Sequence, residues 1–285
     1  MPLLSQRSIG LVLVVVSAII FSSAGLFVKG VEADSWSIIF WRGLSAALFT
    51  GVYILWRRSW HREINQMGRV GVLAAAVGAS STMAFIPAFK LTSIANVSLI
   101  WAAAPLVSAV VAWFWFREKP VRSVLLASVA AFMGVLLIVS GSLGTLSLKG
   151  DLLAVWMTVG MALFLCIYRR YPGTPAAGPA VLMSIMLLPF ALAFSTPFAI
   201  DPHEILVTCC FGLVFSIASV TMAEGAKRLS AIETALIGAL ETPLAPIWAF
   251  VFFSEIPTRY TVVGGSIVLL SVFIAEWSGR KPGGS

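Results

Sequence analysis

Apolar runs of about 20 residues recur along this chain of 285 residues, and short charged or turn-forming gaps separate them. One membrane-crossing helix needs about 20 predominantly apolar residues, because each residue adds only about 1.5 Å of length. A membrane barrel would instead show alternation in runs of about ten residues. The pattern predicts an all-α integral membrane protein with ten transmembrane helices, at roughly 9–28, 36–56, 69–89, 93–116, 122–140, 150–168, 177–196, 204–224, 231–253 and 259–277.

Composition supports a membrane protein over a soluble one. Hydrophobic residues make up 59% of the chain and charged residues only 11%, whereas soluble domains carry about 25% charged residues. The net charge of +7 could suggest nucleic acid. The basic residues fall in the short gaps between apolar runs, however, so they indicate membrane orientation and no nucleic-acid binding.

Lysines and arginines are unevenly divided between the predicted loops. If the N-terminus lies inside, 14 of them fall in inside loops and tails and four fall outside. Cytoplasmic loops of membrane proteins carry the excess of positive charge. We therefore expect a multi-pass protein of the cell membrane, taken to be a bacterial inner membrane, with both termini in the cytoplasm.

An internal repeat links the two halves of the chain. A shift of 137 residues aligns 90–120 with 227–257 and gives nine identities in 31 positions, which include a lysine, a serine, a glutamate and a proline at matching places. The shift maps the fourth predicted span onto the ninth, so each repeat has five helices. We predict repeats at 1–145 and 146–285, the second inverted in the membrane because five is odd.

Inverted five-helix repeats are an architecture of secondary transporters. In such proteins the substrate site lies near the middle of the membrane, between the halves, and discontinuous or kinked helices mark it. Alternating access then comes from rocking one half against the other. Because one chain contains both halves of the pathway, a monomer would suffice.

Several motifs resemble one family over nearly the whole chain. They are "FWRGL" (40–44) in the second span, "FREKP" (116–120) and "FSEIP" (253–257) at the ends of the fourth and ninth spans, and above all the stretch 228–258. Together with the ten spans, they look like the EamA-type branch of the drug/metabolite transporter superfamily. The resemblance implies a small-metabolite carrier, commonly an exporter of amino acids or related compounds, without implying which substrate.

The ninth span carries a carboxylate among apolar residues, in "GALETPLAPIWAF" (238–250). Ionisable groups at this depth are rare and usually face a cavity or a partner. Glu241 has two open interpretations. It faces a cavity, where it binds a substrate amine or exchanges a proton, or it is protonated and bonds to carbonyls of its own helix that Pro243 and Pro246 leave free. The equivalent position in the first half is Ala104, so the acid belongs to one half only.

Other polar and aromatic side chains fall at similar depth. Trp101, four residues before Pro105, is an aromatic wall for the path or a packing residue. Hydroxyl residues permit close helix packing, and one of them could donate to a substrate carboxylate. The predicted substrate site comprises Trp101, Glu241, Ser80, Thr82, Trp156 and Ser219, with Pro105, Pro243 and Pro246 as kinks.

Arg42 has three open interpretations, whereas Glu118 and Glu255 are expected to be structural. Arg42, near the outer end of the second span, pairs with Asp34 or Glu32, snorkels to lipid headgroups, or meets a substrate carboxylate. Glu118 and Glu255 end their spans before prolines and are expected to bond loop backbone or neighbouring basic residues.

Other functions fit the sequence less well. It has no GxxxxGK[ST] motif for ATP and no HExxH or GxSxG motif for an intramembrane enzyme. We expect no cofactor and no metal. A channel-like facilitator or a non-transporting scaffold stays as the alternative to a secondary active transporter, with a small-molecule substrate, the lipid bilayer and, as a candidate coupling ion, protons as its partners.

Overall fold

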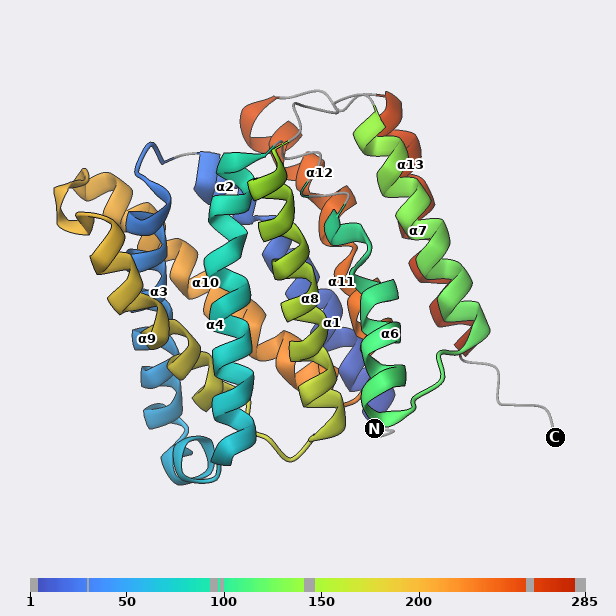
Figure 1. The fold of residues 1–285 in the computed structure, drawn as a ribbon, viewed down its shortest axis with the longest axis horizontal. Coiled ribbons are helices and arrows are strands. Elements are labelled where there is room, and N and C mark those ends of the chain that lie inside the picture. The colour runs from blue at the N-terminus through green and yellow to red at the C-terminus, as the bar shows by residue number, and fades with distance from the viewer. Residues whose placement is uncertain are drawn as a thin grey trace.

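A computed structural model describes residues 5–29, 31–92, 97, 100–140, 147–254 and 259–279. Within these ranges every regular element is a helix (Figure 1). The α-helices are α1 (Gln6–Ser22), α2 (Ala24–Lys29), α3 (Ser35–Trp56), α4 (Gly68–Leu91), α6 (Ala104–Phe116), α7 (Arg122–Ser140), α8 (Leu148–Arg170), α9 (Ala177–Phe194), α10 (Pro202–Ala226), α11 (Ala231–Gly238), α12 (Glu241–Phe253) and α13 (Arg259–Gly279). A π-helical turn, η1 (His61–Asn65), precedes α4, and a 3₁₀ turn, η2 (Pro197–Ala199), precedes α10.

The helices have the length and composition of membrane spans. In the part of the chain that the structure describes, six segments are long and apolar enough to cross a bilayer, and four shorter apolar helices accompany them. Each of these segments overlaps one of the predicted spans. The prediction of an all-helical membrane protein is therefore confirmed.

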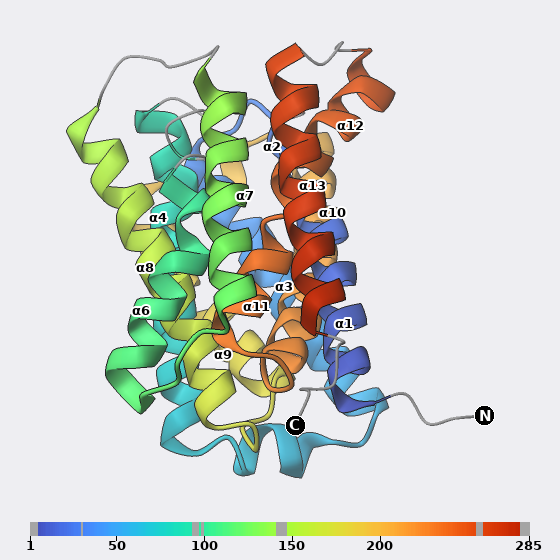
Figure 2. The same cartoon turned by 90° about the vertical axis from the view of Figure 1, so that its right-hand side faces the viewer.

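Helices distant in sequence lie side by side in the bundle. The most extensive contacts are made by five pairs: α7 with α13, α4 with α8, α3 with α9, α1 with α10 and α3 with α10. Figure 2 shows α7 and α13 packed along one edge. Two glycines allow that approach, since a Cβ at Gly264 would lie 2.3 Å from the Gly134 carbonyl oxygen.

The first and ninth predicted spans are each divided into two helices. The first is broken at Ser23, which separates α1 from α2. There the hydroxyls of Ser22 and Ser23 donate to the carbonyls of Ile19 and Ile20, at 2.6 and 2.7 Å. Such side-chain bonds compete with the helical ladder. The ninth predicted span is likewise divided, between α11 and α12.

The helices α6 and α12 occupy equivalent places in the chain. They begin at Ala104 and Glu241 and end at Phe116 and Phe253, so both boundaries are 137 residues apart. The residue after each helix, Arg117 or Ser254, has a left-handed backbone with φ of 57° or 56°. A left-handed residue commonly ends a helix because it satisfies free carbonyls of the last turn.

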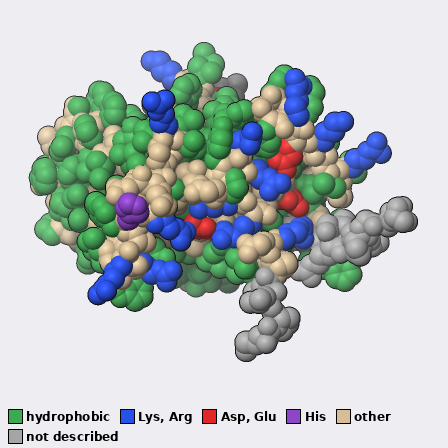
Figure 3. Space-filling view, turned by 90° about the horizontal axis from the view of Figure 1, so that it is seen from below, with side chains coloured by type: hydrophobic (Ala, Val, Ile, Leu, Met, Phe, Trp, Pro, Cys, Tyr) green, Lys and Arg blue, Asp and Glu red, His purple; other side chains and the backbone are tan. Residues whose placement is uncertain are grey.

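One end of the bundle is strongly basic, and we call it the basic end. Figure 3 views this end and shows Lys and Arg side chains gathered there with a few acidic ones between them. α1 begins and α13 ends at this end (Figure 2). α3 and α10 begin at the opposite end.

Candidate functional site

The division between α11 and α12 places Glu241 at a helix start. Backbone bonds run from Leu240 N–H to Ile237 and from Thr242 N–H to Ala239, at 3.0 and 3.2 Å, which closes a tight turn. The first N–H groups of a helix have no intrahelical partner, so a proline in the first turn costs no hydrogen bond.

The three predicted kink prolines have different places. Pro105 lies in the first turn of α6, and Pro243 lies in the first turn of α12, so each stands at a helix start. Pro246 lies inside α12, and because proline has no backbone N–H, the carbonyl one turn earlier receives no hydrogen bond from it. The broken segments therefore arise at turns, and of the three predicted kink prolines only Pro246 lies inside a helix.

Trp101 and Glu241, both predicted site residues, meet where two interrupted segments face each other, one with a turn at Ala103 before α6 and one with a turn at 239–240 before α12. The side chain of Trp101 forms a hydrogen bond with the Glu241 carboxyl group, and the indole N–H is its donor. Trp101 lies one turn before α6, and Glu241 begins α12. Within the described residues no hydrogen bond joins this carboxyl group to carbonyls of its own helix, so its partner comes from the other half of the chain.

Trp156 and Ser80 also meet, but at the outside of the bundle. The Trp156 indole donates to the Ser80 hydroxyl at 2.7 Å, between α8 and α4. The Trp156 side chain is 61% exposed and so lies on the surface of the helical bundle. Thr82 and Ser219 are buried on α4 and α10. Within the described residues, no hydrogen bond joins any of these four side chains to Trp101 or Glu241.

One polar contact at a second break was missed from the sequence. The Trp248 indole of α12 donates to the Ser22 hydroxyl at 2.8 Å, and Ser22 ends α1. The signal in the sequence is the pair of hydroxyl residues Ser22–Ser23 at the end of an apolar run. This bond joins the break in α1–α2 to the helix that Glu241 begins.

Arg42 has none of the partners proposed for it outside the membrane. Its side chain is only 2% exposed, so it does not reach headgroups. Asp34 caps α3, with its carboxylate accepting from the N–H groups of Trp36 and Ser37. The interpretation of Arg42 as a snorkelling or acid-paired residue is therefore wrong.

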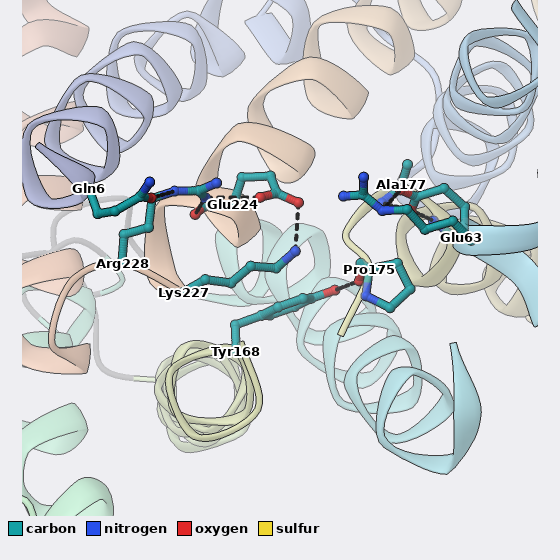
Figure 4. A network of polar contacts seen from close by, with 10 residues as sticks. Gln6, Glu63, Tyr168, Pro175, Ala177, Glu224, Lys227 and Arg228 are labelled. Atoms are coloured by element: carbon teal, nitrogen blue, oxygen red, sulfur yellow. Dashed lines mark hydrogen bonds and ion pairs between the residues drawn. The ribbon is translucent and has the colours of Figure 1, made fainter. Parts of the chain in front are cut away.

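A charged network occupies the basic end (Figure 4). Glu224 pairs with Lys227 and Arg228 at 2.6 and 2.9 Å. Arg228 also donates to the side chain of Gln6 at 3.2 Å, which links α10 to α1. The Lys227 ammonium lies 5.7 Å from the ring centre of Tyr168 on α8. Three helices are thus held together by one cluster.

Loop segments at the same end are tied by a helix cap. The buried carboxylate of Glu63, in η1, accepts from the backbone N–H groups of Ala177 and Gly178 at 3.0 and 3.1 Å. These N–H groups begin α9 and have no intrahelical partner, and a negative charge is favourable at a helix N-terminus.

Two further ion pairs cross between the predicted halves. Arg7 and Glu233 are 3.2 Å apart, and Arg169 contacts both carboxylate oxygens of Glu118 at 3.2 and 3.3 Å. The expectation that Glu118 bonds a neighbouring basic residue is confirmed, whereas Glu255 lies outside the described residues. These four side chains line a cavity of about 250 Å³ that is open at the basic end.

Comparisons with known proteins agree on a transporter. The sequence model of the EamA-like transporter family matches twice, over residues 8–140 and 148–277. A protein of Archaeoglobus fulgidus named "Uncharacterized transporter" is 26% identical over 92% of this chain and 95% of its own. Solute carrier family 35 member G1 of Mus musculus is 25% identical over 92% of this chain and 77% of its own.

A solved crystal structure has the same fold. It superposes with a TM-score of 0.84 at 16% identity, over 96% of this chain and all of the other. At this identity the likeness speaks for the fold alone. The family model, by contrast, covers nearly the whole chain, so the protein belongs to the EamA-like transporter family.

Proposed function

We propose that the protein is a secondary active transporter that exports amino acids or related small metabolites by alternating access. The observation that most directly supports this proposal is the contact of Trp101 with Glu241 between two interrupted helical segments. Interrupted helices near the middle of the membrane hold substrate and coupling-ion sites in secondary transporters. A carboxylate there suits a substrate ammonium group, and an indole suits the remainder of an amino acid.

Two inverted five-helix repeats, 1–145 and 146–285, would form the moving parts. The 137-residue offset of α6 and α12, including the left-handed residue after each, supports this division. The double match of the family model also supports it. Under exchange of the repeats, the pair α4–α8 becomes α10–α1, and both pairs pack closely.

The ion pairs at the basic end would open and close during transport. Arg7–Glu233 and Glu118–Arg169 each join one proposed repeat to the other. All four side chains keep between 17% and 35% of their surface exposed. Partly exposed pairs are each worth at most about 1 kcal/mol, so thermal motion can break them. Charge pairs of this strength suit a gate better than a permanent seal.

We propose that the basic end faces the cytoplasm of a bacterial cell and that the monomer is the working unit. The gathering of Lys and Arg on that end supports the orientation, because positive residues are retained on the cytoplasmic side (Figure 3). One chain carries both proposed repeats and so the whole pathway.

Counterflow in proteoliposomes tests this function. Liposomes loaded with an unlabelled amino acid are expected to accumulate the labelled form through the protein, with a rate that saturates, in a screen with and without a pH gradient. The variant E241Q, which keeps the shape but removes the charge, is expected to slow counterflow or abolish its pH dependence. E204Q, at the start of α10, is the matched control.

Each alternative outcome is specific. Flux that is linear in substrate concentration and shows no counterflow would indicate a channel-like facilitator. Absence of flux for every metabolite tried would indicate a scaffold. Counterflow by E241Q with unchanged rate and pH dependence would remove Glu241 from the mechanism while leaving the carrier.

A further inference from the structure

The guanidinium of Arg42 is buried, and two of its three nitrogen atoms have no hydrogen-bond partner in the part of the chain that the structure describes. Arg42 lies seven residues after Ser35, the first residue of α3, so it is about 10 Å along the helix from that end. Its side chain is 2% exposed. Among the described residues, neither its Nε nor its Nη2 atom has a partner, and Arg42 forms no ion pair.

Aromatic rings cover the face of this guanidinium, whereas the Nε and Nη2 atoms on its edge have no acceptor among the described residues. Its central carbon lies 4.3 Å from the ring centre of Phe215 and 5.5 Å from that of Phe211, both on α10. Phe21 packs edge-on against Phe215 at 5.6 Å, and Phe27 stacks on Phe211 at 5.3 Å. A cation is attracted to the face of an aromatic ring, but the N–H groups lie in the guanidinium plane and gain no acceptor from it.

The helix backbones around Arg42 are held close together. A Cβ at Gly212 of α10 would lie 2.5 Å from the Arg42 carbonyl oxygen, and one at Gly43 would lie 3.3 Å from the Ser184 carbonyl oxygen of α9. The arginine is therefore packed on a rigid three-helix contact. The guanidinium edge without an acceptor therefore lies where α3 packs closely on α10.

A buried charge without a partner is unfavourable, and an anion in contact with it removes that cost. We propose that Arg42 binds a carboxylate group of the transported substrate. Arginine's planar fork of N–H donors matches a carboxylate through two parallel hydrogen bonds. The phenylalanine side chains packed on and behind the guanidinium favour a substrate whose carboxylate is attached to an apolar or aromatic group. This inference rests on the proposed transport function and narrows its substrates to carboxylates.

Benzoate and benzamide are suitable probes because they share shape and differ in charge. The purified full chain, in phosphatidylcholine nanodiscs that contain no anionic lipid, is titrated with sodium benzoate or benzamide in a calorimeter. We expect benzoate to bind and benzamide to bind at least tenfold more weakly. In R42M, benzoate affinity is expected to fall about 10- to 100-fold, the range for a charge-assisted hydrogen bond to a buried group.

The controls separate binding from folding and from transport. R69M removes an exposed arginine at the basic end and is expected to bind benzoate normally. If R42M does not fold, R42K keeps the charge but loses the planar fork, and its affinity is expected to fall about tenfold. Nanodiscs with phosphatidylglycerol test a lipid source: competition by that lipid, with no counterflow of labelled benzoate, would assign the site to a headgroup and overturn the proposal.

Other results would also overturn it. Equal benzoate affinity in wild type and R42M, or equal binding of benzoate and benzamide to wild type, contradicts a carboxylate site at Arg42. Failure of the transport function is distinguishable, because calorimetric binding at Arg42 would persist in a protein that shows no counterflow of any substrate.

Discussion

The Arg7 guanidinium lies 3.2 Å from the Glu233 carboxylate, so the first turn of α1 is paired with the first turn of α11, 226 residues later. The same carboxylate accepts from the backbone N–H of Ser230 at 3.1 Å and completes a capping box. Glu233 therefore has two separable roles, since glutamine serves equally in a capping box but cannot form the ion pair.

We expect E233Q to fold with little loss of stability and to open the basic end more often. The free energy of unfolding should fall by at most about 1 kcal/mol, because the pair is partly exposed. Ala112 lines the cavity beside this pair, so a single cysteine placed there should react faster with a water-soluble maleimide in E233Q than in the parent. R69Q, which changes an exposed charge, is the control. Unchanged labelling in E233Q would mean that the pair closes nothing.

The contact of Trp101 with Glu241 predicts energetic coupling in transport. W101F removes the indole N–H donor, and E241Q replaces the carboxyl acceptor by a neutral amide oxygen, so each variant weakens the same bond. In a double-mutant cycle on kcat/KM for counterflow, the double variant should be scarcely slower than the slower single one. Pairing W248F with E241Q is the comparison, because the Trp248 bond goes to Ser22 instead. Additive losses for W101F and E241Q would show that the contact is incidental to transport.

The helical class and the two breaks were predictable to different degrees. Apolar runs of about 20 residues sufficed for the spans, because the bilayer sets their length. The division after Gly238 was foreseen as kinks at Pro243 and Pro246, but the structure forms a turn at 239–240 and starts a new helix at Glu241. Proline is as compatible with a first helical turn as with a kink, so the sequence alone could not decide between them.

Side-chain partners were harder to predict than helices. The sequence indicates Trp101 and Glu241 by their predicted depth in the membrane. Their contact, however, depends on how the segment before α6 packs against the start of α12. For Arg42 the sequence left three partners open, one of them the lipid headgroups to which arginine side chains commonly snorkel. The two rings that hold it, Phe211 and Phe215, lie about 170 residues later on α10. No local pattern in a single sequence encodes that pairing.

The proposed orientation predicts which loops are reached from the cytoplasm. In a variant without native cysteines, a cysteine at Ser59, between α3 and η1, should be modified in inside-out vesicles by a membrane-impermeant maleimide. A cysteine at Thr196, before η2, should be modified in intact cells or right-side-out vesicles instead. The reverse pattern would place the basic end outside the cell and contradict the proposed direction of the repeats.

Substitution of Gly212 tests how tightly α10 packs on α3. A Cβ there would lie 1.9 Å from the Ser45 hydroxyl oxygen and 2.5 Å from the Arg42 carbonyl oxygen, and backbone cannot yield as a flexible side chain does. G212A is therefore expected to lower the free energy of unfolding by about 1–3 kcal/mol, the range for overpacking.

Gly51, on the same helix α3, supplies the opposite case. A Cβ at Gly51 meets no atom within 4 Å, so G51A should be neutral or raise stability by up to about 1 kcal/mol, because alanine favours a helix more than glycine does. Thermal unfolding of both variants in the same nanodiscs measures the difference. G212A should also weaken benzoate binding, since separating α10 from α3 moves the Phe215 ring away from Arg42, whereas G51A should leave it unchanged. Equal melting temperatures for the two variants would mean that the helices are less closely packed at Arg42 than the structure has them, and the fixed geometry on which the carboxylate site depends would be lost.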